Sequence, residues 1–370
     1  MARCRGSAEL IELHSFGDRV LVHNKVLLTD LSYEQLVSWA TDQGEPPFRA
    51  RQVFEWIYRS LVFDFTSMTN LPLSFRQKLV DLAIIQSLVP LDTLTSANGL
   101  TTKTLLRLGD SETIETVLMR YEGRQTVCVS SQVGCALGCP FCATGQSGFK
   151  RNLSTGEVVD QVLYYARLLK VRDEAVTNVV FMGMGEPLAN YDETWRAIQI
   201  LNDPRGFGLG ARRFTVSSVG WVPGIRRLTQ EKLAVGLAVS LHAADNALRD
   251  RLVPVNRRYP ISELIAACRE YAKSTGRRVS FEYALIQDIN DDLEQARELG
   301  HLLRGLLCHV NLIPLNPTEG CDYCPSSREH VLAFRRVLNR MGIASTVRLA
   351  RGIDIQAGCG QLRSRRRESP

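Results

Sequence analysis

Three cysteines near the middle of the chain stand close enough together to bind one metal centre. Cys135, Cys139 and Cys142 fall within the stretch GCALGCPFCATGQSG (134–148), in the spacing CxxxCxxC. Structural zinc sites usually take four protein ligands, commonly in CxxC pairs, but no fourth cysteine or histidine follows nearby. A four-iron cluster held by three cysteines leaves one iron without a protein ligand. That iron can chelate a small molecule that offers an amine and a carboxylate.

This spacing, with the aromatic Phe141 just before the last cysteine, is typical of radical S-adenosylmethionine (SAM) enzymes. In that superfamily the methionyl end of SAM occupies the open iron of a [4Fe-4S] cluster. The stretch GMGEP (183–187) resembles the GGEP motif of the same superfamily, whose backbone and glutamate hold the methionine amine. A glycine-rich turn alone is weak evidence, since glycine mostly serves tight backbone geometry. At a strand end after a cysteine loop, it supports a SAM site.

The composition is that of a globular protein with a mildly basic charge. Of 370 residues, 45% are hydrophobic and 23% charged, and the net charge is +6. No apolar run approaches the roughly 18 residues that span a bilayer, and the first residues do not resemble a secretory signal. We therefore expect a cytoplasmic protein with reduced thiols. Ten cysteines are many for that compartment, which favours metal binding or thiol chemistry.

Basic pairs recur along the chain, and the C-terminus reads RSRRRESP. Each pair alone is typical of a solvated surface, but together they suggest contacts with the phosphates of a nucleic acid. The pairs are Lys150–Arg151, Arg212–Arg213, Arg226–Arg227, Arg257–Arg258 and Arg277–Arg278.

The order of predicted elements indicates four segments. Residues 1–95 have helical spacing and form a small accessory module, which we expect to bind RNA. Residues 96–123 are a linking segment of short strands. Over 124–350, strands and helices alternate in about six βα units, which predicts an α/β fold with a parallel sheet, open or barrel-like. Residues 351–370 form a tail. The cysteine loop, GMGEP, SLHA and NP all follow strand ends, where ligands bind in such folds.

Longer stretches resemble one family over nearly the whole chain. They are PPFRARQVFEWIY, MTNLP, CVSSQVGCALGCPFCATGQSGFKRNL, FMGMGEPLANY, AVSLHA, VNLIPLNP and RGIDIQAGCGQL. These are similar to the radical SAM RNA adenine methyltransferases of the RlmN type. The resemblance implies a partial (βα)6 barrel behind a small N-terminal RNA-binding domain. It also implies methylation of carbon 2 of an adenine in 23S rRNA near the peptidyl transferase centre, and of the adenosine beside the tRNA anticodon.

The resemblance implies catalytic roles for three residues. Cys359 matches the cysteine that accepts a methyl group from one SAM and, after hydrogen abstraction by a radical from a second SAM, bonds to the adenine. Glu115 matches the residue that accepts the proton from that carbon. Cys128 matches the cysteine that attacks Cys359, forming a disulfide and releasing the methylated RNA. Two SAM molecules are thus used per turnover. Without the resemblance, Cys128 is an ordinary buried strand residue and Cys359 an exposed tail cysteine.

Cofactor contacts and partners follow from the same resemblance. Cys135, Cys139 and Cys142 would hold the cluster, and the expected SAM contacts are Gly185, Glu186, Ser217, Ser240, Leu241, His242 and Asn316. For His242, a structural role is the alternative. The expected partners are 23S rRNA, tRNA and a one-electron donor such as a flavodoxin system, with no membrane association and a monomeric state.

Three other functions remain open on the sequence. The first is methylation at carbon 8 of the same rRNA adenine, by related enzymes that share the cluster and both catalytic cysteines. The second is a non-catalytic RNA-binding protein with a structural metal. The third is another radical SAM reaction, such as sulfur insertion, which would usually need an extra cluster. The sequence also departs from the family pattern at CDYC, which contains Cys321 and Cys324. Together with Cys308, His309 and His330, these cysteines raise the possibility of a second metal site, although loop cysteines without a metal are the simpler interpretation.

Overall fold

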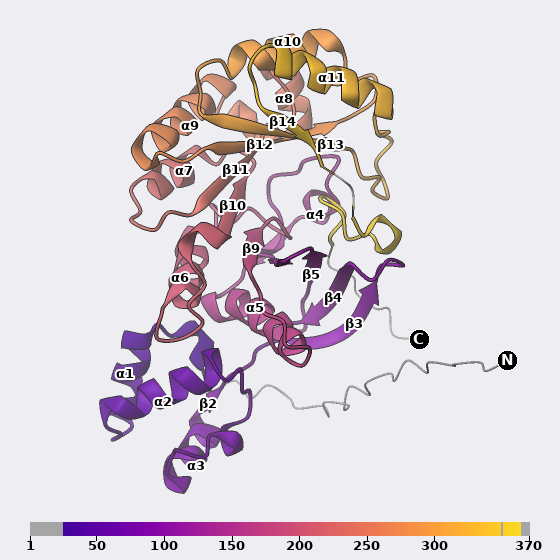
Figure 1. Ribbon diagram of the computed structural model, residues 1–370. Helices are drawn as coiled ribbons and strands as arrows, with labels where there is room; N and C mark the ends of the chain where they lie inside the picture. The colour runs from indigo at the N-terminus through magenta and orange to yellow at the C-terminus, as the bar shows by residue number, and fades with distance from the viewer. Residues whose placement is uncertain (1–24, 349–350, 364–370) are drawn as a thin grey trace, which may run out of the picture.

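The computed structural model describes residues 25–348 and 351–363, which are built around one curved, ten-stranded sheet (Figure 1). Cys4 and most of the basic C-terminal stretch lie outside these residues. The strands, in spatial order, are β14 (Ser345–Val347), β13 (Cys308–Pro314), β12 (Val279–Leu285), β11 (Gly236–Ser240), β10 (Phe214–Ser218), β9 (Asn178–Phe181), β6 (Arg124–Cys128), β5 (Thr113–Tyr121), β4 (Thr101–Arg107) and β3 (Val89–Thr95).

Within this sheet, the seven strands β6, β9, β10, β11, β12, β13 and β14 are parallel, and helices connect them. The long connecting helices are α5 (Thr155–Lys170), α6 (Tyr191–Asn202), α7 (Val222–Thr229), α9 (Ile261–Thr275), α10 (Leu293–Leu302) and α11 (Arg328–Arg340), and the short α8 (Asn246–Leu252) precedes α9. They lie on the outer side of the sheet (Figure 1). This arrangement confirms the predicted α/β fold with six βα units. Among the described residues β14 and β3 do not pair, so the barrel is partial.

Strands β3, β4 and β5 extend the sheet beyond β6 in antiparallel order. Turns at Gly99 and Gly123, both with positive φ, connect β3 to β4 and β5 to β6. Residues 89–95 differ from our expectation of a helical segment. Their sequence, VPLDTLT, contains a proline and β-branched residues, which favour an edge strand over a helix. The extension brings Glu115 on β5 into the same sheet as Cys128 on β6.

The N-terminal module contains the predicted helices α1 (Tyr33–Asp42), α2 (Pro47–Tyr58) and α3 (Leu73–Leu82). Strands β1 (Val26–Leu27) and β2 (Ala83–Ile84) pair in parallel and bring its two ends together. Asp30 joins the module to the barrel, because its carboxylate accepts the backbone N–H of Gly156 at 2.6 Å. Asp160 on α5 similarly accepts both the N–H and the hydroxyl of Ser87 at 2.7 Å.

A capping box fixes the start of α5. The Ser154 side chain accepts the Glu157 N–H, and the Glu157 side chain accepts the Ser154 N–H at 2.9 Å. Just before this helix, the antiparallel pair β7 (Gln132–Gly134) and β8 (Phe149–Asn152) encloses the cysteine loop and the short helix α4 (Ala143–Gln146). The loop therefore leaves and re-enters the fold at one place, on the inner side of the sheet (Figure 1).

Candidate active site

The base of the cysteine loop depends on glycine at position 134. Gly134 has φ of +74°, and a Cβ atom there would lie 1.8 Å from the carbonyl oxygen of Gly148. That carbonyl accepts the backbone N–H of Cys135 at 2.8 Å. Any side chain at 134 would therefore separate the two ends of the loop and displace the first cysteine.

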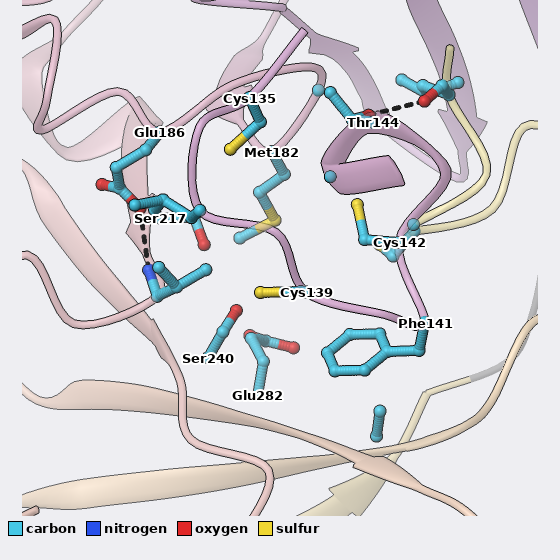
Figure 2. Close-up of a pocket in the computed structure, with 18 of the residues that line it drawn as sticks. Cys135, Cys139, Phe141, Cys142, Thr144, Met182, Glu186, Ser217, Ser240 and Glu282 are labelled. Atoms are coloured by element: carbon cyan, nitrogen blue, oxygen red, sulfur yellow. Dashed lines mark hydrogen bonds between the residues drawn. The ribbon is translucent and has the colours of Figure 1, made fainter. Parts of the chain in front are cut away.

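The three cysteines of the loop line one cavity, of about 1100 Å³ including its open mouth. Figure 2 shows the sulfurs of Cys135, Cys139 and Cys142 directed into this space from different sides. Ser217 on β10, Ser240 on β11 and Glu282 on β12 also line this cavity and are labelled in Figure 2.

The thiol environment fits an iron–sulfur cluster. Burial raises the pKa of Cys135 to about 12, and burial likewise raises the pKa of Cys139 and Cys142. Thiolates at these positions thus need a strong positive centre beside them. In the described part of the chain, no three His, Cys, Asp or Glu side chains converge as a single-ion site. Ligands spread around a larger space suit a cluster, in which each thiolate binds a different iron.

Gly185 and Glu186 form the cavity wall beyond β9. Gly185 has φ of +98°, and a Cβ atom there would lie 2.5 Å from that of Gln132. The Glu186 carboxylate accepts the N–H groups of Leu188 at 3.1 Å and Val219 at 2.9 Å. Burial nevertheless raises the pKa of Glu186 to about 7. A buried carboxylate at the cavity wall is suited to bind the ammonium group of an amino acid.

Ser240 and His242, at the end of β11, line the cavity, whereas Leu241 between them is fully buried and does not. His242 has φ of +62°, and its ring lies edge-on to Phe141 with centroids 5.0 Å apart. Its Nδ1 accepts the N–H of Ala284 at 3.0 Å. Burial, followed by the charge of Arg249, lowers the pKa of His242 to about 3. The imidazole is therefore neutral, and its hydrogen is on Nε2.

Asn316 and Cys359 line the cavity from the other side. The Asn316 amide donates to the carbonyl oxygen of Cys359 at 3.1 Å. One residue later, the carbonyl of Gly360 accepts the N–H of Ala143 at 2.8 Å. The segment that carries Cys359 is thus fixed to the residue that follows Cys142, although more than 200 positions separate them in the sequence.

Cys128 and Glu115 lie behind this cavity and do not line it. Cys128, at the end of β6, is buried, and its pKa is raised to about 12 by burial and then by the nearby Cys359. Glu115 is 3% exposed and makes an ion pair with Lys103 at 3.0 Å. All nine cysteines among the described residues are free thiols, so the two predicted catalytic cysteines are close but not joined.

Two charged residues of the cavity, Glu282 and Arg348, escaped the sequence analysis. Their side chains approach to 3.9 Å, and one Glu282 oxygen, Oε2, has no hydrogen-bond partner. Burial raises the pKa of Glu282. A glutamate in the middle of the apolar strand VSFEYAL is the signal that could have identified Glu282, since an unexplained charge in a buried strand favours a site.

The other candidate ligands form ordinary contacts. His309 pairs with Thr346 at 2.9 Å, and His330 with Asp291 at 3.3 Å. Cys321 and Cys324 lie in the loop between β13 and α11. Several basic residues bind neighbouring carboxylates instead of standing free, as Lys150 does with Glu112 and Arg151 with Asp110 and Glu157. No helix in the described ranges is long and apolar enough to cross a membrane.

Two protein-family models match the chain. Residues 26–85 match the "Ribosomal RNA large subunit methyltransferase N-terminal domain", and residues 129–300 match the "Radical SAM superfamily". The fold and the three-cysteine cavity accordingly define a radical SAM enzyme, a class that uses a [4Fe-4S] cluster and SAM.

Curated relatives and a solved structure identify the family. A probable dual-specificity RNA methyltransferase RlmN from Roseiflexus castenholzii is 48% identical over 90% of this chain and 95% of its own length. The Chloroflexus aurantiacus protein of the same name is 49% identical, covering 91% and 93%. A crystal structure of a radical SAM methyltransferase from Sphaerobacter thermophilus shares 52% identity, with a TM-score of 0.90 over 91% of this chain and 99% of that one. The chain belongs to the RlmN family of radical SAM methyltransferases, which rules against the non-catalytic alternative.

Proposed function

We propose that this enzyme methylates carbon 2 of adenine, in 23S rRNA and in tRNA beside the anticodon, through a methylated cysteine and a transient bond to the RNA. The printed names of the relatives, dual-specificity RNA methyltransferases, support the two RNA classes. The observation that carries the proposal is that Cys359 lines the same cavity as Cys135, Cys139 and Cys142. A thiol in that position is exposed to chemistry that begins at the cluster.

Carbon 2 of adenine requires an unusual route. It lies between two ring nitrogens, so it is electron-poor, and no general base of ordinary strength would turn it into a nucleophile. Methyl transfer from a sulfonium needs a nucleophile, and a cysteine thiolate is one. Cys359 would take the methyl group by displacement and later present it to the adenine ring as a carbon-centred radical.

The cofactor would be held by the residues that line the cavity. Cys135, Cys139 and Cys142 would bind the cluster, and Gly185 and Glu186 the methionyl amine of SAM. Ser217, Ser240, His242 and Asn316 would contact the rest of SAM, with Leu241 holding the β11 loop through its backbone. Bound together, cluster and SAM supply a 5′-deoxyadenosyl radical when one electron arrives from a reductant such as a flavodoxin system. Two SAM molecules would be consumed per turnover.

Cys128 would resolve the bond between protein and RNA. After the Cys359 methylene group adds to carbon 2, the radical adduct would lose one electron, which the cluster would take back, and one proton, for which Glu115 is the proposed acceptor. The Cys128 sulfur then attacks the Cys359 sulfur, the carbon–sulfur bond breaks, and the released carbon takes up a proton to become the methyl group. The proximity of Cys128 to Cys359, reflected in the pKa of Cys128, supports this step.

The proposal can be tested anaerobically. The cluster-loaded protein is given SAM, a reductant and an rRNA fragment that contains the target adenine, and the digested RNA is analysed by mass spectrometry. Cys359→Ala and Cys128→Ala are run beside it, with Cys268→Ala as the matched control, because Cys268 is a fully buried thiol on α9 outside the cavity.

We expect 2-methyladenosine from the intact protein and from Cys268→Ala, no product from Cys359→Ala, and a covalent protein–RNA adduct from Cys128→Ala. Product that is 8-methyladenosine would retain the mechanism and overturn the position. Full activity of Cys359→Ala would overturn the methylated-cysteine route. A tRNA substrate tested in parallel decides whether both RNA classes are methylated.

A further inference from the structure

A buried lysine holds the carboxylate of Glu115. Lys103 on β4 and Glu115 on β5 are diagonal neighbours on one face of the sheet, because Lys103 pairs with Val117 and Glu115 with Leu105 in the antiparallel register. The Lys103 Nζ atom lies 3.0 Å from Glu115 Oε1, and the two side chains are 3% and 4% exposed. Among the ion pairs of the described residues, this one is the most deeply buried.

The pair is also attached to the segment that carries Cys359. Lys103 Nζ donates a second hydrogen bond to the carbonyl oxygen of Gln356 at 3.1 Å, three residues before the cysteine. The other Glu115 oxygen, Oε2, accepts the backbone N–H of Arg363 at 3.0 Å, four residues after it. Lysine and glutamate thus bind this segment on both sides of Cys359.

Burying this pair is costly, which calls for a purpose. Removing two charges from water costs several kcal/mol per ion, and a buried pair is often no more stable than apolar residues of similar volume. The geometry indicates that purpose: Lys103 holds the Glu115 carboxylate in one position while it also binds the segment that carries Cys359.

We propose that Lys103 is a positioning residue that keeps the Glu115 carboxylate aligned with the RNA adduct on Cys359; this inference rests on the proposed function. In the step it serves, the carbon–hydrogen bond at carbon 2 breaks and its electron pair stays in the purine ring. The proton passes to the Glu115 carboxylate, which becomes a neutral acid, while Lys103 keeps its charge and its bond to Gln356.

The experiment separates this step from those before it. Lys103→Met removes the ammonium group and Lys103→Arg retains a cation. Each cluster-loaded variant is given SAM, reductant and an RNA with deuterium at carbon 2 of the target adenine. Three quantities are measured: 5′-deoxyadenosine formed, covalent protein–RNA adduct on a denaturing gel, and methylated RNA released. Mass spectrometry of the digested adduct reports whether the deuterium is retained.

For Lys103→Met we expect 5′-deoxyadenosine formation similar to that of the wild type, an accumulated adduct that retains deuterium, and product release slowed roughly 100-fold, the usual contribution of a general base. Lys103→Arg should release product at a rate closer to that of the wild type. Release from Lys103→Met at the wild-type rate would overturn the proposal. Equal losses of 5′-deoxyadenosine and product without an adduct would overturn it too, because they indicate only a structural role.

Two controls keep the result decisive. Circular dichroism and iron content report whether each variant folds, and Lys103→Gln, which keeps a neutral donor, replaces Lys103→Met if that variant does not. If neither neutral variant folds, Lys103 is a structural residue and the proposal is wrong. Failure of the wild-type protein to methylate adenine would instead refute the proposed function itself.

Discussion

The buried guanidinium of Arg249 donates its Nε hydrogen to the carbonyl oxygen of Leu241 at 3.0 Å. Its Nη2 atom donates to the carbonyl oxygens of Val219 at 2.6 Å and Ser240 at 3.2 Å. One side chain therefore fixes the loops after β10 and β11, which supply much of the cavity wall opposite the cysteines. Arg249 is fully buried and forms no salt bridge among the described residues, so backbone oxygens are its main partners.

Replacing Arg249 by methionine should destabilise the protein strongly. The change removes the donor from three carbonyl groups, and leaving a buried polar group without its hydrogen bond costs about 1–3 kcal/mol. The free energy of unfolding, measured by denaturant titration, tests this. Arg226→Met is the matched control, because Arg226 is half exposed and its carboxylate partners lie at 3.5 and 3.6 Å. The control should lose less than about 1 kcal/mol; equal losses in both variants would contradict the assigned role of Arg249.

A methyl group at position 134 should prevent cluster binding. Gly134→Ala places a Cβ atom against the Gly148 carbonyl and moves Cys135, so iron and sulfide content should fall severely. Gly138→Ala is the control, since Gly138 also has a positive φ, +64°, but nothing lies within 4 Å of its Cβ position. The Gly138→Ala variant has only a backbone strain of about 1–2 kcal/mol, so this variant should retain its iron. Full iron content in Gly134→Ala would refute the steric argument.

The neutral state of His242 should appear in the pH dependence of stability. Its pKa in the folded protein, about 3, lies below the 6.5 of the unfolded chain, so only the unfolded chain gains a proton as the pH falls below 6.5. The free energy of unfolding should therefore decrease between pH 7.5 and 5.5 by about 1.4 kcal/mol through this residue. His242→Gln, which can still accept from Ala284, should lack this contribution.

Glu186 has the opposite effect on the pH dependence of stability. Its pKa is raised above the ordinary value, so the folded protein binds this proton more tightly than the unfolded chain does. The difference between wild type and His242→Gln, measured by denaturant titration at both pH values, isolates the histidine. An unchanged difference at the two pH values would show that His242 is not buried in its neutral form.

SAM affinity should increase with pH through the titration of Glu186. With a pKa of about 7, this carboxylate is mostly protonated at pH 6 and mostly ionised at pH 8, and only the ionised form attracts an ammonium group. The affinity should rise about tenfold over that interval. Equilibrium dialysis of the cluster-loaded protein under anaerobic conditions measures it. Glu186→Gln should bind SAM weakly and without this pH dependence; the same dependence in the variant would assign the titration to another group.

Local sequence was sufficient to predict where most of the cavity residues lie. In a parallel sheet, every strand points its carboxyl end at the same edge, so motifs that follow strands must meet there. From that rule we expected the cysteine loop, Glu186, Ser240 and Asn316 to face one cavity, and all of them line it. The capping box at Ser154 can also be recognised from local sequence, because it depends only on neighbours within one turn.

The charged partners could not be predicted in this way. Lys103 stands in the stretch TTKTLLR, where a single lysine among alternating residues is typical of a solvent-facing position. Its burial depends on the strand extension beyond β6 and on residues more than 250 positions away. Glu282 with Arg348 and Arg249 with Val219 are likewise contacts between distant segments. The edge strand β3, in contrast, could have been predicted, since the proline and β-branched residues of VPLDTLT favour an edge strand over a helix.

The two family matches divide the proposed chemistry along the chain. The three cluster cysteines and most of the proposed SAM contacts lie within residues 129–300, whereas Glu115, Cys128 and Cys359 lie outside that range. The segments before and after the superfamily region meet around its cavity through Lys103, Gln356 and Arg363. In the proposed mechanism, a radical generator common to the superfamily is thus combined with flanking residues that determine what the radical makes. Evolution or protein engineering could exchange those flanks and obtain a different product from the same generator.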